Sequence, residues 1–236
     1  MKEQARVRWR AFSSAKGRTG WPSCHRHGQT IAMHDVPGDL LHLDIKKLGR
    51  FERPGHRVTG DRQQNTPGAG WKYVHVAFDD HSRVAFSSVH PDETSWSACL
   101  ALLLTVRYYA SLGIRFTRVL TDNGACYRSR RFQRLCRRLQ LKNRRSRPYS
   151  PRTNGKVERF IQTVLREWAY AWSYASSEER GRHLHAWLYQ YNWHRPHASL
   201  SYQPPISRLG LSVNNLQGSH LEMTVHDTLG HRKRTV

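Results

Sequence analysis

The 236-residue sequence has little of what marks secreted or membrane-bound proteins. Its four cysteines are scattered and include no Cys-x-x-Cys pair, which argues against a disulfide framework and favours a reducing compartment. No apolar run approaches the length of a transmembrane helix, and the start MKEQARVRWRAF has no apolar signal-peptide core. We therefore expect a soluble, cytoplasmic protein.

Acidic residues are also scarce. The chain has 17 Asp and Glu against 39 Lys and Arg, a formal net charge of +22. Such an excess repels itself unless polyanions are near, and nucleic acid neutralises it with release of counterions. An anionic membrane is the rival partner, but no basic amphipathic helix with an apolar aromatic face supports it. Composition leaves a third explanation open, a simple preference for arginine.

The pattern of the chain divides it into four segments. Residues 1–37 are basic with little periodicity, and we interpret them as an arm or a remnant. Residues 38–175 carry alternating strand and helix patterns and form the predicted core. Residues 176–217 predict a helical extension of that core, and the tail 218–236 shows no pattern.

Alternation of apolar and polar residues predicts the strands. Leu41, Leu43 and Ile45 alternate with polar neighbours, which favours a strand over 40–48. Residues 71–90 predict a hairpin that turns at Asp79-Asp80-His81-Ser82. Short strands are expected within 116–124 and 141–148. The five glycines and two prolines of 49–70 predict a long loop.

Apolar residues at helical spacing predict four helices. These are expected over 95–111, around 132–139, over 157–168, and from Ser177 to His194-Arg195-Pro196. The third is the clearest, with Asn154 or Thr153 as its N-cap. The order of strand, hairpin, helix, strand, helix, short strand and helix predicts a mixed α/β sheet flanked by helices.

Three acidic residues occupy unexpected positions. Asp44 lies within an apolar strand, Asp122 ends another at Asp-Asn-Gly, and Glu158 lies in the first turn of a helix. Glu158 is also the only acid among fourteen Lys and Arg residues between positions 128 and 166. Taken singly, each has an ordinary structural explanation: a solvated strand residue, a turn former, and an acid favoured by the helix dipole.

Taken together, the three acids predict a metal site. Converging carboxylates repel one another unless divalent cations neutralise them. Oxygen ligands of this kind suit Mg²⁺ or Mn²⁺ rather than zinc. Two such ions about 4 Å apart can activate an attacking oxygen and stabilise a leaving one in phosphoryl transfer. A basic surface around them would hold DNA.

Three sequence blocks resemble the signature blocks of insertion-sequence transposases of the integrase-core superfamily, which are similar to retroviral integrases. These are LLHLDIKKLG, VLTDNGACYRS and PYSPRTNGKVERFIQTV. The second and third acids are separated by 158 − 122 − 1 = 35 residues, as is typical of that group. YNWHRPHASLSYQPPISRL resembles the block that follows the core in bacterial members, so the resemblance spans residues 38–217.

The resemblance implies a ribonuclease H-like fold in which Asp44, Asp122 and Glu158 bind two Mg²⁺ or Mn²⁺ ions. It implies cleavage that exposes a 3′-hydroxyl, attack of that hydroxyl on target DNA, and a homo-oligomer on DNA. Side chains flanking the third acid are expected to contact DNA. These are Asn154, Lys156 and Arg159, with Arg152 and Lys46 as weaker candidates.

The sequence departs from the family pattern in its first 37 residues. Members normally carry a helix-turn-helix there, and we find no such helix pair. We therefore expect a truncated or frameshifted chain, or one divided from a DNA-reading partner. Two alternatives stay open: a non-catalytic DNA-binding remnant of a decayed mobile element, and a nuclease of the same fold that cuts without joining.

Overall fold

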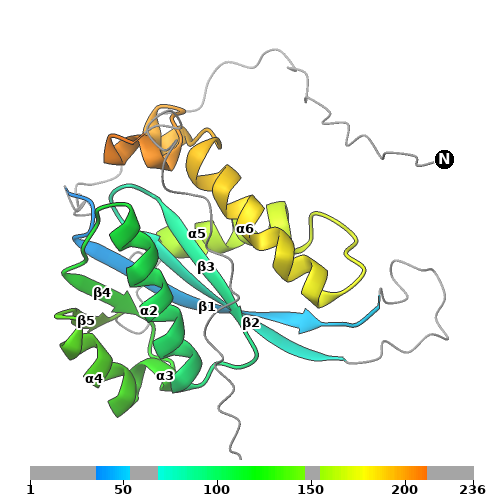
Figure 1. The fold of residues 1–236 in the computed structure, drawn as a ribbon, viewed down its shortest axis with the longest axis horizontal. Coiled ribbons are helices and arrows are strands. Elements are labelled where there is room, and N and C mark those ends of the chain that lie inside the picture. The colour runs from blue at the N-terminus through cyan, green and yellow to red at the C-terminus, as the bar shows by residue number, and fades with distance from the viewer. Residues whose placement is uncertain (1–35, 54–68, 147–154, 212–236) are drawn as a thin grey trace, which may run out of the picture. The chain divides into compact units, whose positions relative to one another are not determined.

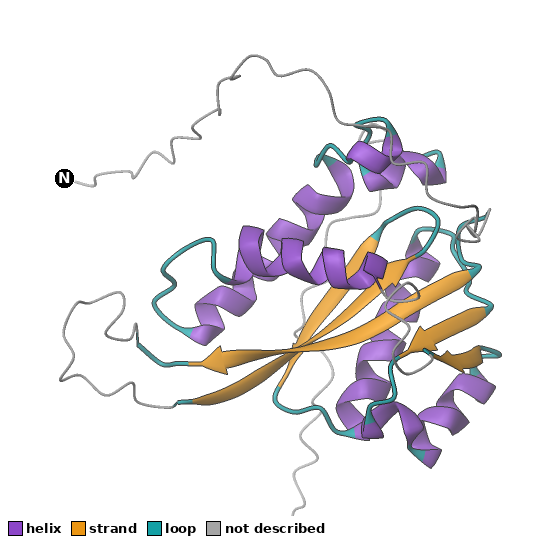
Figure 2. Ribbon diagram, turned by 180° about the vertical axis from the view of Figure 1, so that it is seen from behind, coloured by secondary structure: helices purple, strands orange, loops and turns teal. Residues whose placement is uncertain are grey.

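The computed structural model describes residues 36–53, 69–146 and 155–211. These residues form a five-stranded mixed sheet with helices on both faces (Figures 1 and 2). Most of the predicted N-terminal arm, the middle of the predicted loop 49–70 and the tail lie outside them. None of the described helices is long and apolar enough to cross a membrane.

The sheet has the strand order β3-β2-β1-β4-β5. Its strands are β1 Leu40–Arg50, β2 Gly70–Asp79, β3 Ala85–His90, β4 Arg118–Thr121 and β5 Lys142–Arg145. The first three form an antiparallel meander, whereas β4 pairs in parallel with both β1 and β5. The predicted strand over 40–48 and the predicted hairpin are therefore confirmed.

The helices form two groups. The first is α2 Ser95–Ser111, α3 Ala125–Arg128 and α4 Arg130–Arg138, and the second is α5 Gly155–Val164, the π-helical turn η2 Leu165–Ala169 and α6 Ser177–Trp193. Two 3-10 turns follow, η3 Ala198–Leu200 and η4 Pro205–Leu209. All four predicted helices are present, but the third changes to a π-helical turn after Val164, and the sequence pattern did not predict α3.

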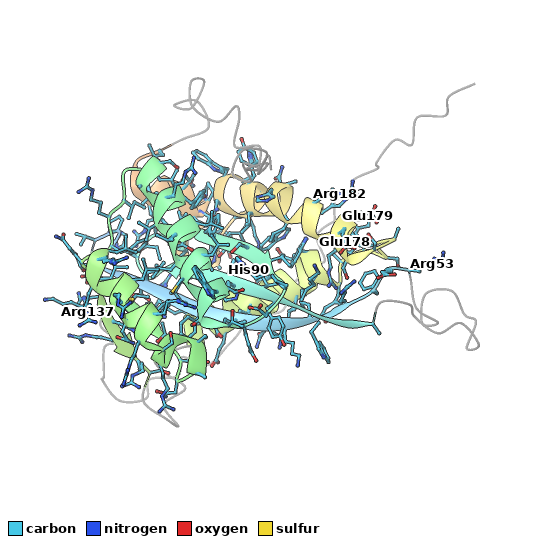
Figure 3. All side chains as sticks on the ribbon, turned by 60° about the horizontal axis from the view of Figure 1, so that its bottom comes forward. Arg53, His90, Arg137, Glu178, Glu179 and Arg182 are labelled. Atoms are coloured by element: carbon cyan, nitrogen blue, oxygen red, sulfur yellow. The ribbon has the colours of Figure 1, made fainter. Side chains whose placement is uncertain are left out.

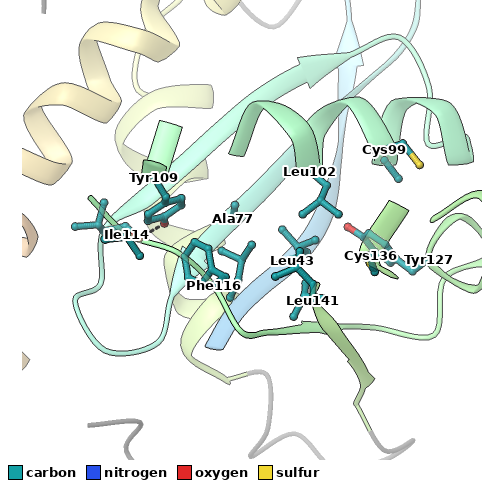
Figure 4. Close-up of a cluster of buried hydrophobic side chains, with 14 of the residues drawn as sticks. Leu43, Ala77, Cys99, Leu102, Tyr109, Ile114, Phe116, Tyr127, Cys136 and Leu141 are labelled. Atoms are coloured by element: carbon teal, nitrogen blue, oxygen red, sulfur yellow. Dashed lines mark hydrogen bonds between the residues drawn. The ribbon is translucent and has the colours of Figure 1, made fainter. Parts of the chain in front are cut away.

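The alternation of β1 divides its side chains between two cores, one on each face of the sheet. Leu41 and Leu43 pack with α2, α3 and α4, in the cluster of which Figure 4 shows a part. There the hydroxyl of Tyr109 donates to the carbonyl of Val84 at 2.6 Å. Val74, Val76 and other residues of the opposite face pack with α5 and α6. Asp44 belongs to that second face, because neighbouring strand residues point to opposite sides.

Polar bonds from α6 join it to the sheet. The side-chain amide of Asn192 pairs with both the N–H and the carbonyl of Ala85, each at 2.8 Å, on the edge strand β3. Arg180 donates to the carbonyl of Gly49 at 2.6 Å, at the far end of β1. Helix α6 thus contributes to the second core. The division between the predicted core 38–175 and its predicted extension 176–217 stays a prediction.

Candidate active site

Asp44 and Glu158 line the same open pocket. Asp44 lies in the middle of β1 on the face covered by α5, and Glu158 lies in the first turn of α5. The pocket has a volume of about 360 Å³ and is lined by Asp44, Ile45, Lys46, Glu158, Ile161, Gln162 and Leu165. Folding thus brings together two acids that are 158 − 44 = 114 positions apart in the sequence.

Asp122 follows the last residue of β4, the strand beside β1. The two strands pair in parallel from Leu40 with Arg118 to His42 with Leu120, a constant offset of 118 − 40 = 78. This pairing ends at Leu120, two residues before Asp122, while β1 continues from His42 to Asp44. Neighbouring strands lie about 4.8 Å apart, so we expect the second acid to lie near the first.

The buried phenol of Tyr127 is affected by the charges of both aspartates. Burial raises the pKa of Tyr127 well above its usual value, and the negative charges of Cys126, Asp44 and Asp122 raise it further. Tyr127 lies in α3, directly after the Asp122 turn, and is only 2% exposed. The carboxylates of Asp44 and Asp122 therefore both act on one buried hydroxyl.

Backbone bonds hold one oxygen of each aspartate. Oδ1 of Asp44 accepts from the N–H of Ile45 at 2.7 Å, and Oδ1 of Asp122 accepts from the N–H of Gly124 at 2.9 Å. A Cβ atom at Gly124 would lie 3.0 Å from that same Oδ1 of Asp122. Glycine at this position therefore lets the turn approach the carboxylate closely.

The chemistry of these acids fits a hard divalent cation, but the three do not form one cluster. Carboxylate oxygens are the donors that Mg²⁺ and Mn²⁺ prefer, and two of the three acids share an open pocket. Within the part of the chain that the structure describes, however, no group of three His, Cys, Asp or Glu side chains could hold a metal ion. Binding of metal by Asp44, Asp122 and Glu158 stays a prediction.

Lys156 forms an ion pair inside the protein. Its Nζ lies 2.8 Å from each carboxylate oxygen of Asp80, which follows β2 in the hairpin turn. Oδ1 of Asp80 also lies 3.0 Å from Nε2 of His42 and 3.7 Å from the guanidinium of Arg83. Because Lys156 precedes Glu158 by two residues, this pair fastens the first turn of α5 to the sheet.

Asp80 is held as a carboxylate by its partners. It is 4% exposed, and such burial by itself raises the pKa of a carboxyl group. The hydrogen bonds from His42 and Lys156 and the charges of these two side chains outweigh burial, so the pKa of Asp80 is well below its usual value. The negative charge of the buried Asp80 is therefore neutralised inside the protein by Lys156.

The remaining predicted DNA contacts lie in different surroundings. Lys46 is exposed and lines the pocket beside Asp44, and Arg159 is exposed on α5 next to Glu158. Arg152 and Asn154 lie outside the described residues. Contact of these side chains with DNA stays a prediction.

Asp79 and Asp80 both lie where the hairpin was predicted to turn, but their side chains have different partners. Asp79 shapes the turn, because its Oδ2 accepts from the N–H and the hydroxyl of Ser82 at 2.8 and 2.5 Å. Asp80 instead points to His42 and Lys156. One part of this arrangement could be read from the sequence: the alternation of β1 places His42, a partner of Asp80, on the same face as Asp44.

The strand order and the helices on both faces define a ribonuclease H-like fold, and solved structures share it. The chain resembles the catalytic core domain of BIV integrase, with a TM-score of 0.51 and 21% identity over 72% of this chain and 92% of that one. It also resembles the HTLV-2 integrase catalytic core domain in complex with magnesium, with a TM-score of 0.52 and 18% identity over 74% and 97%. At these identities the likeness establishes the fold alone.

Sequence comparison identifies the family. One model of the integrase core domain matches residues 35–151, and a second model of the same description matches residues 139–205. The putative transposase InsD for insertion element IS2E of Escherichia coli is 33% identical over 87 residues, 36% of this chain. The Gag-Pro-Pol polyprotein of sheep pulmonary adenomatosis virus is 36% identical over 112 residues, 48% of this chain. The chain belongs to the integrase core family, together with insertion-sequence transposases.

The chain spans only part of these relatives. The matched region covers 39% of the IS2E protein and 6% of the viral polyprotein. At the level of the family, integrase cores serve DNA integration or transposition. The activity and partners of this chain are therefore matters for a proposal.

Proposed function

We propose that this chain is the catalytic core of a DNA transposase. It cleaves a DNA strand to expose a 3′-hydroxyl and joins that hydroxyl to target DNA, as an oligomer on DNA in the cytoplasm. Asp44, Asp122 and Glu158 would hold two Mg²⁺ or Mn²⁺ ions. When bound, such ions activate the attacking oxygen and stabilise the leaving oxygen.

One observation carries this proposal: Asp44 and Glu158 line one open pocket on the sheet. If Asp44 were only a solvated strand residue and Glu158 only a helix acid, the fold would not need to bring them into one pocket from 114 positions apart. The third member is supported by the parallel pairing of β4 with β1, which ends two residues before Asp122. The protein's own part is to orient these three carboxylates and to keep Glu158 in place through the Lys156–Asp80 pair.

A second candidate is a DNA-binding protein without catalysis. It is favoured by the finding that no described group of three acids could hold a metal ion. A nuclease that cuts without joining would use the same three carboxylates and is distinguished only by its products.

The test uses the purified chain with Mg²⁺ or Mn²⁺, a plasmid target and labelled oligonucleotides that carry the terminal sequences flanking its gene. We expect joined products, whereas nicks alone would indicate a nuclease. Binding without products in either metal would refute the catalytic proposal for this chain.

The variant Asp122→Asn is expected to abolish products while DNA affinity changes little, because it removes one metal ligand and leaves the fold intact. Glu178→Gln is the matched control. It also removes one negative charge, from an exposed acid on α6 that lies away from the pocket. Products that persist in Asp122→Asn would show that the triad assignment is wrong.

A further inference from the structure

Helix α4 carries a continuous basic stripe. Five arginines of its nine residues are exposed: Arg130, Arg131, Arg134, Arg137 and Arg138. At about 100° per residue they fall within an arc of about 120°. Phe132 and Cys136 on the opposite side are buried in the first core. Figure 3 shows Arg137 extending from α4 away from the body of the protein.

The basic surface continues beyond α4. Arg128 precedes the helix, and Lys142, Arg144 and Arg145 on the edge strand β5 are also exposed. No acid occurs in the sequence between Asp122 and Glu158. Among the described residues, no ion pair joins any of these nine side chains to an acid. We call these nine residues the α4–β5 surface.

An aromatic ring adjoins this surface. Trp96, in the first turn of α2, is 68% exposed, and the guanidinium of Arg131 lies 4.1 Å from the centre of its ring. When an arginine stacks on an exposed tryptophan, one face of its guanidinium contacts the ring. Its charge and its N–H groups remain available to bind phosphate. Basic side chains interleaved with an exposed aromatic ring are typical of surfaces that bind nucleic acid.

A purely structural explanation covers only part of this surface. Charged residues on an edge strand such as β5 prevent it from pairing with other strands. That reason does not apply to α4, whose backbone groups are satisfied within the helix. Five like charges on one helix face repel one another, so a stable fold does not require them.

We infer that the α4–β5 surface binds the phosphate backbone of duplex DNA, separately from the pocket that holds Asp44 and Glu158. The inference rests on the proposed action on DNA and adds which surface of the protein binds the duplex. The arginine stripe is about 12 Å long, which matches about three to four base pairs along a duplex axis. Arginine suits this role because its guanidinium binds phosphate through two parallel hydrogen bonds.

The test measures affinity for a duplex as a function of salt concentration, without divalent metal, so that it does not depend on catalysis. The variant combines Arg134→Ala, Arg137→Ala and Arg138→Ala, which keeps helix propensity. Each lost phosphate contact lowers the slope of log affinity against log salt by about 0.9. We expect a slope smaller by about two to three and an affinity at least tenfold weaker near 0.1 M salt.

The matched control removes the same charge elsewhere, through Arg107→Ala, Arg182→Ala and Arg208→Ala. These arginines are exposed on α2, α6 and η4, and Figure 3 shows Arg182 beside Glu178 and Glu179. Equal losses in both triple variants would mean that net charge alone drives binding and would overturn the inference, as would an unchanged slope in the α4 variant. If the α4 variant loses binding while the unmodified chain makes no products, only the proposed function fails.

Discussion

Replacing Lys156 tests whether this side chain binds DNA, as its place beside Glu158 predicts, or holds α5 on the sheet, as its contacts indicate. Hydrogen bonds between charged groups contribute about 1.5–3 kcal/mol, and breaking a fully buried pair costs about 3–5 kcal/mol. Asp80 is 4% exposed but the Lys156 side chain is 25% exposed, so solvent screens the pair in part. We expect Lys156→Met to destabilise the fold by about 2 kcal/mol.

A double-mutant cycle with Asp80→Asn measures this pair directly by urea unfolding. The two changes are expected to be non-additive by at least about 1 kcal/mol, because each removes the same contact. Lys72→Met is the matched control, since Lys72 is 29% exposed and lies 3.9 Å from Glu178, which is 60% exposed. That exposed pair is expected to contribute less than about 0.5 kcal/mol.

The outcome separates the two roles of Lys156. Loss of DNA affinity without loss of stability, and an additive cycle with Asp80→Asn, would refute the structural role. If the pair positions Glu158, Lys156→Met lowers the rate of cleavage at saturating DNA and leaves the apparent KM for DNA nearly unchanged. A change in KM alone would indicate a DNA contact.

The same pair has a defined acid dependence. The folded-state pKa of Asp80 is lowered relative to the unfolded chain, so its contribution to stability is complete above about pH 4 and is lost as pH falls toward the folded-state value. Asp80→Asn removes this dependence. An Asp80→Asn variant whose stability falls as steeply as that of the unmodified protein below pH 4 would contradict this assignment.

Three further predictions concern other parts of the molecule. Burial, followed by the nearby charge of His90, lowers the pKa of His75 to about 4. The free energy of unfolding is therefore expected to fall by up to about 3 kcal/mol between pH 6.5 and 4. Urea unfolding of His75→Phe should show a smaller fall over the same range. Asn192→Ala leaves the backbone N–H and carbonyl of Ala85 without their side-chain partner, so we expect the free energy of unfolding to fall by about 2–4 kcal/mol. A fall below about 1 kcal/mol would show that water replaces the amide. If the pocket binds Mg²⁺, an ion concentration tenfold above its Kd stabilises the fold by about 1.4 kcal/mol; calorimetry should show this rise, and Asp44→Asn should abolish it.

The local patterns predicted most of the elements because each pattern reflects contacts that a single element makes. The alternation of Leu41, Leu43 and Ile45 predicted β1, since a strand between two layers needs an apolar face. The helical spacing around Phe132 predicted α4 for the same reason. The π-helical turn after Val164 was not predicted, because its apolar residues keep a spacing that an α-helix also satisfies.

Contacts between distant segments could not be predicted in this way. Nothing near Lys156 in the sequence indicates that Asp80 will neutralise it, because the two are 76 positions apart. In the sequence Lys156 is one more cation in a basic run and Asp80 is one more acid in a turn. The pair forms because folding places the first turn of α5 beside the hairpin turn that carries Asp80.

Local pattern, residue chemistry and block order were enough to predict the family, the mixed α/β class and three acids whose types and spacing suit a divalent metal. Only the folded chain shows that Asp44 and Glu158 share a pocket and that Lys156 is bound by Asp80. The physical reason is that strand register and helix packing set distances between segments, and these distances determine which charges meet each other and which meet solvent.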